Sequence, residues 1–343
     1  MATIKEIAKL AGVSIGTVDR VIHDRGLVNE QTKKKVLSVI KELNYKPNAV
    51  AQGLAVRKKK LKFCFFIPDS KRNPYFHKVY EAARKKAEEL KQYGIQVVFH
   101  FIGTESIFLD SADNISLDYL DDIDGIAMIG LEIMEINLCL DKAKERDIPV
   151  VFYNTIIPDR DYLAFVGCNY VDSGRMAAGL IALAGGEDAQ VCIYTEGPTK
   201  VRSCSDRLLG FQNEVEEKYP RMKLLEVCKI SSNQIDNYLS VKDMIQKYPD
   251  VNIMYIVNPA DYGICEAIHR ADEKNQIKII TNDLVKEQVD MIRQGIISAT
   301  VCQEPEKQGS KPLEILFNYL ALGKTPEEKM CYTNLSIHIA QNI

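Results

Sequence analysis

The chain has 343 residues, of which 46% are hydrophobic and 27% charged, a composition typical of a soluble globular protein with two or three compact units. No apolar run is long enough to span a bilayer, and MATIKEIAKL lacks the regions of a secretory signal, so we expect a cytoplasmic protein without membrane contact. Nine cysteines lie singly, with no CxxC pair and no histidine at ligand spacing, which argues against a zinc site and for reduced core residues.

The net charge of −3 is distributed unevenly along the chain. Residues 1–60 hold 13 Lys and Arg against 5 Asp and Glu, a net charge of +8, which leaves −11 for the remainder. Lysine and arginine neutralise phosphates and release counterions. A basic N-terminal segment on an acidic body therefore favours a nucleic-acid-binding head, although charge alone would also fit a solvated surface.

Two short helices are predicted at the N-terminus. Thr3 followed by Glu6 forms a capping box that opens the first helix, and Gly12 should end it with a left-handed turn. Ser14 then caps a second helix. The apolar positions of the two helices define a shared core, made of Ile4, Ile7, Ala8, Leu10, Val18, Val21 and Ile22. Two helices joined by a tight glycine turn predict a helix-turn-helix.

The second helix has the residues of a recognition helix on the face away from that core. Its N-terminal turns would enter the major groove of DNA, and they hold Ile15, Gly16, Thr17, Asp19 and Arg20. Arg20 is the expected reader of guanine. Asp19 either accepts a hydrogen bond from cytosine or braces Arg20, and Gly16 has no side chain, so the residues do not fix the base sequence.

A third helix is predicted over Gln31–Leu43, capped by Asn29. Its Val36, Leu37, Ile40 and Leu43 would close a three-helix core, and the head would end near residue 46. Lys33, Lys34 and Lys35 stay exposed, where they would contact DNA phosphates or only keep the surface soluble. Together with the recognition helix, the expected DNA contacts include Thr3, Ser14 and Asn29.

The segments TIKEIAKLAGVSIGTVDRVI and ELNYKPNAVAQGLA resemble the lactose-repressor (LacI/GalR) family of transcription regulators. The resemblance implies that residues 47–60 are a hinge and linker, and that the hinge becomes helical on operator DNA. It also implies DNA contacts for Asn48, Ala51 and Leu54, with Leu54 as a wedge in the minor groove. An apolar wedge at a base step kinks the duplex, which agrees with that role, and Gly53 makes the isolated segment a poor helix.

From Leu61 onward, short β-rich runs alternate with amphipathic helices, which predicts an α/β body of two doubly wound parallel sheets. The expected strands are Phe63–Ile67, Gln96–Phe101, Gly125–Ile129, Val150–Tyr153, Gln190–Tyr194, Leu224–Cys228, Ile253–Ile256 and Lys278–Thr281. The expected helices are Tyr75–Tyr93, Glu135–Arg146, Asp172–Leu183, Ser205–Lys218, Asn233–Lys247 and Tyr262–Asp272.

The body, residues 61–343, is predicted to form two lobes. A break near Phe165–Asn169 separates four strands from four more. Lobe 1 would span about 61–165 plus about 299–325, and lobe 2 about 168–296 plus about 327–343. A closing strand is expected directly before Ser336–Ile343, where the chain ends, and no leucine-heptad tail follows, which favours a dimer over a tail-made tetramer. Ligands of open α/β sheets bind outside the carboxyl ends of the strands, so we expect a cleft there.

The body resembles the ribose-type periplasmic sugar-binding proteins over nearly all of residues 61–343. The positions that match the ligand-binding pattern are Asn73, Tyr75, Phe76, Asn154, Asn169, Arg207, Asn258, Asp283 and Gln303. Such polar and aromatic groups suit a small sugar or polyol, because amides, carboxylates and arginine bond hydroxyls while rings cover the apolar face. Asn154 stands where the ribose-type pattern usually has Asp.

Each position also has a purely structural interpretation. Asn73 and Asn258 could be helix caps, Arg207 an ordinary ion pair on a helix face, and Tyr75 and Phe76 core residues. The recurrence of these positions at junctions between strands and helices favours a pocket.

Two other functions were weighed. A transport-binding protein would fit the body, but it does not fit the missing signal peptide and the extra head. An enzyme is not favoured, because no GxSxG, GxxxxGK[ST] or HExxH motif occurs and no cofactor is expected. The acidic cluster of Asp121, Asp122 and Asp124 fits a solvated loop better than a metal site. The expected function is thus a bacterial repressor that binds operator DNA as a homodimer, close to the nucleoid, and responds to a sugar-like effector.

Overall fold

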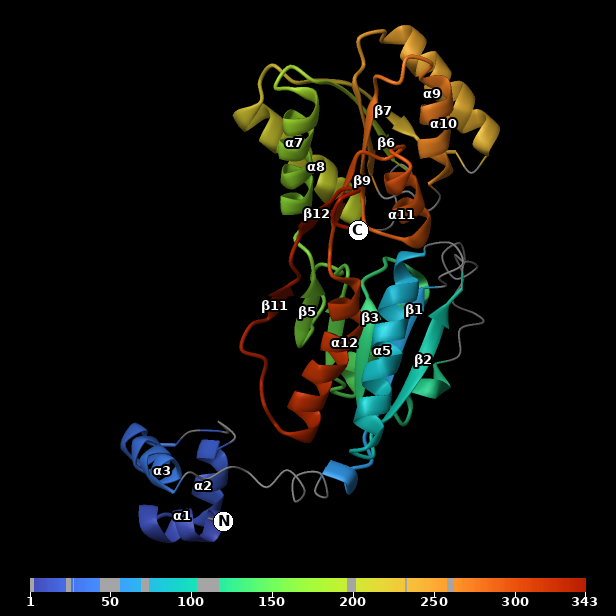
Figure 1. Ribbon diagram of the computed structural model, residues 1–343. Helices are drawn as coiled ribbons and strands as arrows, with labels where there is room; N and C mark the ends of the chain where they lie inside the picture. Colours follow the sequence, from blue (N-terminus) through green and yellow to red (C-terminus); the bar gives the residue numbers. More distant parts are fainter. Residues whose placement is uncertain are drawn as a thin grey trace.

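A computed structural model describes residues 3–22, 26, 28–43, 56–68, 74–103, 117–195, 202–231, 233–257 and 262–343. Figure 1 shows the three helices of the head beside a body of two lobes stacked end to end. Among the described residues, no helix is both long enough and apolar enough to cross a bilayer.

The head is the predicted three-helix unit, with α1 at Ile4–Ala11, α2 at Ile15–Ile22 and α3 at Glu30–Glu42. Thr3 and Glu6 form the capping box, and Gly12 ends α1 with φ 64°. The buried core consists of Ile7, Ala8, Ala11, Val18, Val21 and Val36.

Two of the predicted core residues of the head were placed wrongly. Leu10 is 60% exposed and Leu37 is 46% exposed, because three short helices close around Ala8, Ala11 and Val36 and leave the outer faces of α1 and α3 in solvent.

Lobe 1 has a six-stranded sheet in the order β11-β5-β4-β3-β1-β2, and every pairing in it is parallel. Its elements are β1 (Lys62–Pro68), α5 (Tyr75–Lys91), β2 (Gln96–Ile102), a 3₁₀ turn η2 (Asp118–Leu120), β3 (Gly125–Ile129), α6 (Met134–Glu145), β4 (Val150–Tyr153), β5 (Ala164–Gly167), α12 (Pro305–Leu316), a π-helical turn η3 (Phe317–Ala321) and β11 (Met330–Tyr332).

Lobe 2 repeats this plan in the order β12-β10-β9-β8-β6-β7, with only β12 antiparallel to its neighbour. Its elements are α7 (Tyr170–Gly185), β6 (Gln190–Thr195), α8 (Ser203–Lys218), β7 (Lys223–Lys229), α9 (Gln234–Lys247), β8 (Ile253–Val257), α10 (Gly263–Ala271), β9 (Lys278–Asn282), α11 (Lys286–Arg293), β10 (Ala299–Cys302) and β12 (Ser336–His338).

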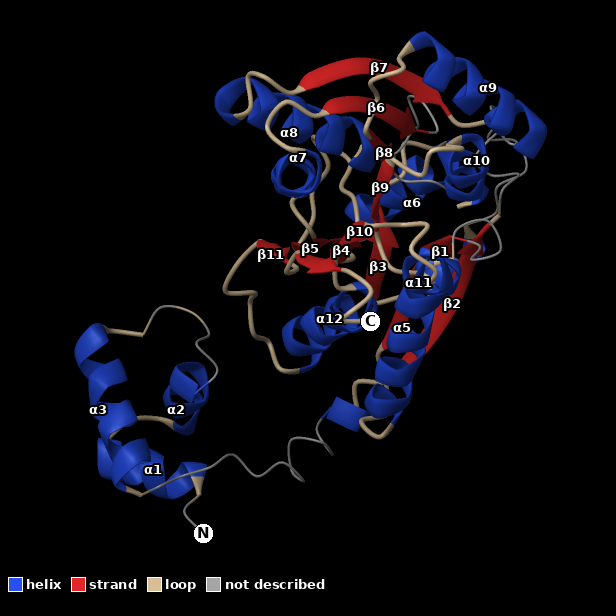
Figure 2. Ribbon diagram, turned by 45° about the horizontal axis from the view of Figure 1, so that its top comes forward, coloured by secondary structure: helices blue, strands red, loops and turns tan. Residues whose placement is uncertain are grey.

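Strand β8 shows how helices cover both faces of the lobe 2 sheet, as Figure 2 also shows. Ile253, Tyr255 and Val257 point to the core shared with α7 and α8. The alternate residues Met254 and Ile256 point to the core shared with α9 and α10. A strand that is apolar on both sides is typical of a doubly wound parallel sheet.

The sequence missed several elements near the crossovers between the lobes. The predicted break at Phe165–Asn169 is in part a strand, β5, and the helices α11 and α12 and the strand β10 were not predicted. β5 and β10 have only four residues each and include small or polar ones such as Gly167 and Thr300, so they lack the wholly apolar run by which β4 was recognised. Strand β11 at Met330–Tyr332 lies shortly before Ser336, where the closing strand was expected, and a further strand, β12, covers Ser336–His338.

The lobe boundaries move as a consequence. Residues 299–302 belong to the sheet of lobe 2, and residues 330–332 pair with β5 in the sheet of lobe 1. The crossovers therefore lie between residues 167 and 170, 302 and 305, and 332 and 336. The crossovers directly follow the strands β5, β10 and β11.

The helices that follow two of the crossovers pack closely on their neighbours. A Cβ on Gly174 of α7 would lie 2.0 Å from the Arg207 carbonyl oxygen of α8, and one on Gly309 of α12 would lie 2.1 Å from the Val79 carbonyl oxygen of α5. Only glycine permits backbones to approach this closely. The pairs α7–α8 and α12–α5 are thus fixed by equivalent contacts in the two lobes.

The acidic cluster before β3 has structural partners. Asp121 lies 2.8 Å from Lys142 and 3.0 Å from Arg146, and Asp122 lies 2.7 Å from the Lys62 ammonium. The backbone N–H of Lys62 donates to Asp124. The cluster joins β1, β3 and α6, and no group of metal-ligating side chains occurs within the described residues.

Candidate functional site

The candidate site begins with two residues in equivalent places. Asn154 directly follows β4 and Asp283 directly follows β9, the third strand in the order of each sheet. Both have left-handed backbones, with φ 63° and 66°. Asn and Asp tolerate this conformation better than other non-glycine residues, and such strained positions cluster at functional sites. In each sheet, the third strand is thus followed by a polar residue whose left-handed backbone fixes the position of its side chain.

In lobe 2, Asp283 faces a buried arginine. Arg207 of α8 is 1% exposed, and its Nη2 lies 3.7 Å from the Asp283 Oδ1. Its Nε donates to Ser173 Oγ over 3.2 Å, and its guanidinium carbon lies 4.8 Å from the centre of the Tyr170 ring. Burial acts to lower the pKa of Arg207, but the Asp283 carboxylate, together with the nearby groups of Cys168 and Tyr170, raises the pKa above its ordinary value. The guanidinium is therefore a permanent buried cation with several donor hydrogens.

Lobe 1 brings aromatic rings to the same place. Tyr75 and Phe76 open α5 and are buried, with their rings edge to face at 5.3 Å. Burial raises the pKa of the Tyr75 phenol well above its ordinary range, and the charge of Asp283 raises it further. Lys78 of α5 also donates to the Leu284 carbonyl oxygen of lobe 2 over 2.9 Å. The start of α5 therefore lies against the residues that follow β9.

Two glutamines join the lobes. The amide of Gln303, which follows β10, donates to Asp283 Oδ1 over 2.9 Å. Its oxygen accepts from Gln308 of α12 over 2.6 Å, and the Gln308 oxygen accepts from Asn154 over 3.0 Å. Asn154, Gln303 and Gln308 are all buried. A hydrogen-bonded chain thus runs from the end of β4 in lobe 1 to Asp283 and Arg207 in lobe 2.

The structure brings together six of the nine predicted ligand-binding positions. They are Tyr75, Phe76, Asn154, Arg207, Asp283 and Gln303. Asn169 serves as the N-cap of α7, where its oxygen accepts from the N–H groups of Val171 and Asp172. Asn73 and Asn258 lie outside the described residues.

The sequence analysis missed Gln308. Its signal was available, since it lies five residues after Gln303, but helix α12 had not been predicted and the residue could not be placed. Arg207 also differs from the structural alternative of a pair on a helix face, because it is buried between α7 and α8.

In the head, the predicted DNA-contact residues surround the start of α2. Ser14 accepts from the Thr17 N–H over 3.1 Å, and the two hydroxyls lie 2.9 Å apart. Ile15 is 49% exposed, and Gly16 and Arg20 are also exposed. Asn29 caps α3 by accepting from the Gln31 N–H. Asn48, Ala51 and Leu54 of the predicted hinge lie outside the described residues.

The linker after the hinge is anchored on lobe 1. Val56 is 3% exposed and belongs to the lobe 1 core. Arg57 Nε donates to the Gln92 carbonyl oxygen at the end of α5, and Lys59 Nζ donates to the carbonyl oxygens of Leu320 and Ala321 beyond α12. The linker therefore holds the far ends of the two helices whose near ends carry Tyr75 and Gln308.

Comparison with known proteins gives matches for both parts of the chain. Residues 64–325 match the family model described as periplasmic binding protein domain, and residues 3–48 match the one described as bacterial regulatory proteins, lacI family.

Among curated relatives, a ribose operon repressor of Bacillus subtilis is 27% identical over 271 residues, 79% of this chain and 76% of the relative. The HTH-type transcriptional regulator RegA of Clostridium saccharobutylicum is 59% identical over 61 residues, 18% of each chain. The fold of the body is similar to a crystal structure described as a LacI transcriptional regulator from Bacteroides fragilis, with TM-score 0.73, 21% identity and coverage of 82% of this chain and 98% of that one.

Proposed function

The chain belongs to the lacI family of bacterial regulatory proteins and has a periplasmic-binding-protein body, and from that premise we propose that it is a repressor whose grip on operator DNA is controlled by a small sugar or polyol. The observation that carries the proposal is the buried site of Arg207, Asp283, Asn154 and Tyr75 between two lobes, on a chain with a helix-turn-helix head. The proposal places the protein with DNA in the bacterial cytoplasm.

The chemistry of the site supports a sugar-like effector. Arg207 offers donors, Asp283 offers acceptors, and the amides of Asn154 and Gln303 offer both, so vicinal hydroxyl groups find matching partners. Tyr75, Phe76 and Tyr170 supply apolar ring surface for the carbon face of a sugar. A relative described as a ribose operon repressor agrees with this class of effector.

The helices α5 and α12 offer a route from the effector to the hinge. α5 has 17 residues and so is about 25 Å long. Its first turn holds Tyr75, and Arg57 of the linker binds its far end. We propose that lobe closure moves α5 and α12 as one pair and so changes the spacing of two hinge segments in a dimer. The change in operator affinity equals the difference between the effector's affinities for the two states.

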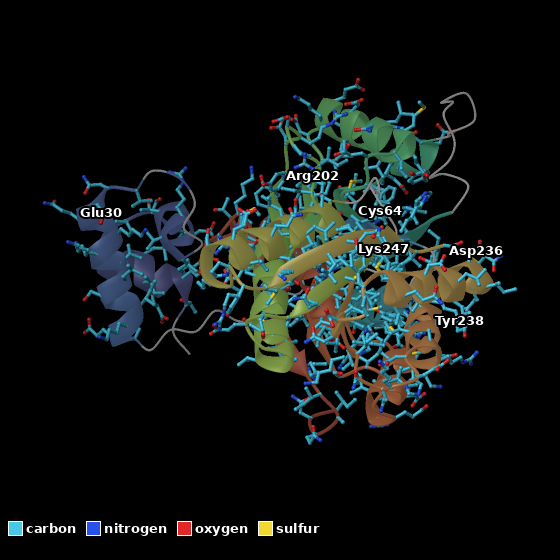
Figure 3. All side chains as sticks on the ribbon, turned by 90° about the horizontal axis from the view of Figure 1, so that it is seen from above. Glu30, Cys64, Arg202, Asp236, Tyr238 and Lys247 are labelled. Atoms are coloured by element: carbon cyan, nitrogen blue, oxygen red, sulfur yellow. The ribbon has the colours of Figure 1, made fainter. Side chains whose placement is uncertain are left out.

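The proposal includes a homodimer, because a helix-turn-helix protein reads two half-sites about one DNA turn apart. Both lobes expose apolar side chains near an edge strand: Phe101 of β2 in lobe 1, and Val227, Ile235 and Leu239 on β7 and α9 in lobe 2. Figure 3 places Asp236 and Tyr238 of α9 at the edge of the molecule away from Glu30 of the head. We propose this side as the surface that pairs with a second copy.

The dimer is tested by sedimentation of a variant with Ile235→Asp and Leu239→Asp. We expect a monomer at micromolar concentration, because four carboxylates would have to be desolvated in a symmetric interface. Leu183→Asp is the matched control, since Leu183 of α7 is 86% exposed on another face and should leave the dimer intact. A dimer that survives the double substitution would move the interface elsewhere.

The effector class is tested by thermal unfolding of the full chain with a panel of pentoses, hexoses, polyols and their phosphates. A ligand at 100 times its Kd should stabilise the body by about 2.7 kcal/mol, a shift of a few degrees. Arg207→Ala should lose that shift and any effect of the sugar on DNA binding. Silence across the panel would overturn the sugar-like effector and leave the DNA-binding role standing.

The operator is tested with duplexes selected from a random-sequence DNA pool. Leu54→Ala should weaken binding to the selected duplex while leaving the thermal shift with the effector unchanged; unaltered DNA binding would remove the wedge from the mechanism. Adding the effector to the complex then gives the sign of the response. Release marks an inducer, and tighter binding marks a corepressor.

A further inference from the structure

The chain of side-chain amides between the lobes has a direction. Asp283 can only accept hydrogen bonds as a carboxylate, so Gln303 must present its NH₂ group to it, as it does over 2.9 Å. The Gln303 oxygen is then left to face Gln308, whose NH₂ group donates to it over 2.6 Å. The same reasoning leaves the Gln308 oxygen to accept from Asn154.

We propose that Gln308 is the positioning residue of the effector site. Through Gln303 and Gln308, the carboxylate of Asp283 in lobe 2 sets which way the amide of Asn154 in lobe 1 is turned. This inference rests on the proposed function only for the identity of the site, since the hydrogen bonds between the three amides are present without effector. The Asn154 NH₂ group donates one hydrogen bond to Gln308, and the Asn154 oxygen remains available to accept a hydrogen bond from an effector. A group of the effector that meets the Asn154 oxygen is accordingly a hydrogen-bond donor, a hydroxyl or an amine.

Burial makes it costly in free energy to reverse any of these hydrogen-bonded amides. Gln308 is 0% exposed, Asn154 is 5% exposed and Gln303 is 7% exposed, so water does not replace a wrongly turned amide. A buried polar group without a partner costs about 1–3 kcal/mol. One reversed amide would place two oxygens or two NH₂ groups face to face at each of its ends. Because Asp283 holds the NH₂ group of Gln303, neither of the other two amides can turn without such a mismatch.

Gln308 is placed by its backbone neighbours. It precedes Gly309, whose missing side chain lets α12 lie directly on the Val79 carbonyl of α5. This close contact fixes the height of the first turn of α12 relative to β4, and it brings the amide within reach of both Asn154 and Gln303. In lobe 2 the residue before Gly174 is Ser173, which instead accepts from Arg207.

The test is a double-mutant cycle between two residues that share Gln303 as their partner, Gln308 and Asp283. Gln308→Glu replaces the donor with a carboxylate, and Gln303 then has carboxylates on both sides but only one NH₂ group. Asp283→Asn removes that conflict, because an asparagine can donate to the Gln303 oxygen while Gln303 turns toward position 308. Unfolding by urea is measured for the full chain, its two single variants and the double variant, without effector.

We expect Gln308→Glu to lower the urea midpoint strongly in the original chain and much less in the Asp283→Asn background. If the single variant does not accumulate as folded protein, folding of the double variant gives the same positive result. An equal loss in the urea midpoint in both backgrounds would overturn the proposal that the three amides are held in one direction. Gln308→Leu is the control, because it removes the amide without a charge conflict and should give a similar penalty with either residue at position 283.

The cycle is independent of the effector, so its failure and a failure of the sugar proposal are distinguishable. If D-ribose or another sugar of the panel binds, the positioning role of Gln308 can also be tested through sugar binding. In the Gln308→Glu chain, binding of that sugar should improve as the pH falls, because a protonated carboxyl group can donate to Gln303 as the amide does. Binding that is independent of pH in this variant would contradict the positioning role.

Discussion

The two lobes have the same architecture but opposite electrostatic character at the site. β4 corresponds to β9 in the strand order, so Asn154 and Asp283 are equivalent, and both have φ near 65°. Val79 and Arg207 are equivalent as well, since each lies under the glycine of a crossover helix. Lobe 1 thus presents a neutral amide at the place where lobe 2 presents a carboxylate paired with a buried cation.

This difference suggests a division of labour. A buried ion pair needs both partners, since either charge left alone costs several kcal/mol. Lobe 2 therefore holds a rigid charged half-site, whereas the neutral half in lobe 1 can be separated from it more cheaply. An opening of the lobes that breaks the bonds of Gln303 and Gln308 leaves Arg207 and Asp283 together.

The largest effect should come from breaking the ion pair of lobe 2. Arg207→Met leaves Asp283 buried without its cation, and we expect a loss of about 3–5 kcal/mol in the free energy of unfolding, measured with urea. Adding Asp283→Asn makes the pair neutral, as in lobe 1, and should restore most of the loss.

Arg175 of α7 offers the control for that prediction. Its guanidinium, with the side chain 34% exposed, bonds Glu214 and Glu217 near the surface, so Arg175→Met should cost no more than about 1 kcal/mol. Equal losses from the two substitutions would mean that Asp283 gains nothing special from Arg207.

The next largest effect should come from the close glycine contacts that the two lobes share. Gly174→Ala and Gly309→Ala each place a methyl group about 2 Å from a carbonyl oxygen, and we expect similar losses of about 3 kcal/mol in urea unfolding. Gly179→Ala on α7 is the control, because its Cβ would meet only the Tyr219 hydroxyl at 3.6 Å, and it should be neutral or stabilising. Strongly unequal losses at Gly174 and Gly309 would contradict the equivalence of the two crossings.

The smallest effect should come from making the strand ends alike. Asn154→Asp removes the donor to Gln308, and we expect a loss of about 2 kcal/mol near pH 7. The buried carboxyl group would have a folded pKa above its unfolded value of about 3.9. Such a group binds its proton more tightly in the folded state, so the penalty should shrink as the pH falls toward 4 and grow as it rises. A penalty that does not change with pH would show that position 154 is open to solvent.

Prediction from sequence succeeded where a pattern is local and long. The capping box of Thr3 and Glu6, the turn at Gly12 and the cap at Asn29 follow from neighbouring residues, and the structure has all three. The long helices of the body were placed to within a few residues for the same reason. Six of the nine predicted effector positions lie together in the structure, and their binding of an effector stays a prediction.

The failures share a cause as well. Leu10 and Leu37 looked like core residues, but the small head has no room to bury every leucine. The short strands β5 and β10 include small or polar residues and have no wholly apolar run, so the crossovers and the lobe boundaries were misplaced. Without α12, Gln308 had no place in the predicted site.

The sequence by itself determined that this protein has a basic helix-turn-helix head and an α/β body, because caps, turns and apolar periodicity act over a few residues. Only the tertiary structure decided which half of the site is charged and how the halves are joined. The pairing of Arg207 with Asp283 spans 76 positions of the chain, and the bond from Asn154 to Gln308 spans 154. Contacts at such separations depend on how sheets and helices pack, and no local pattern encodes them.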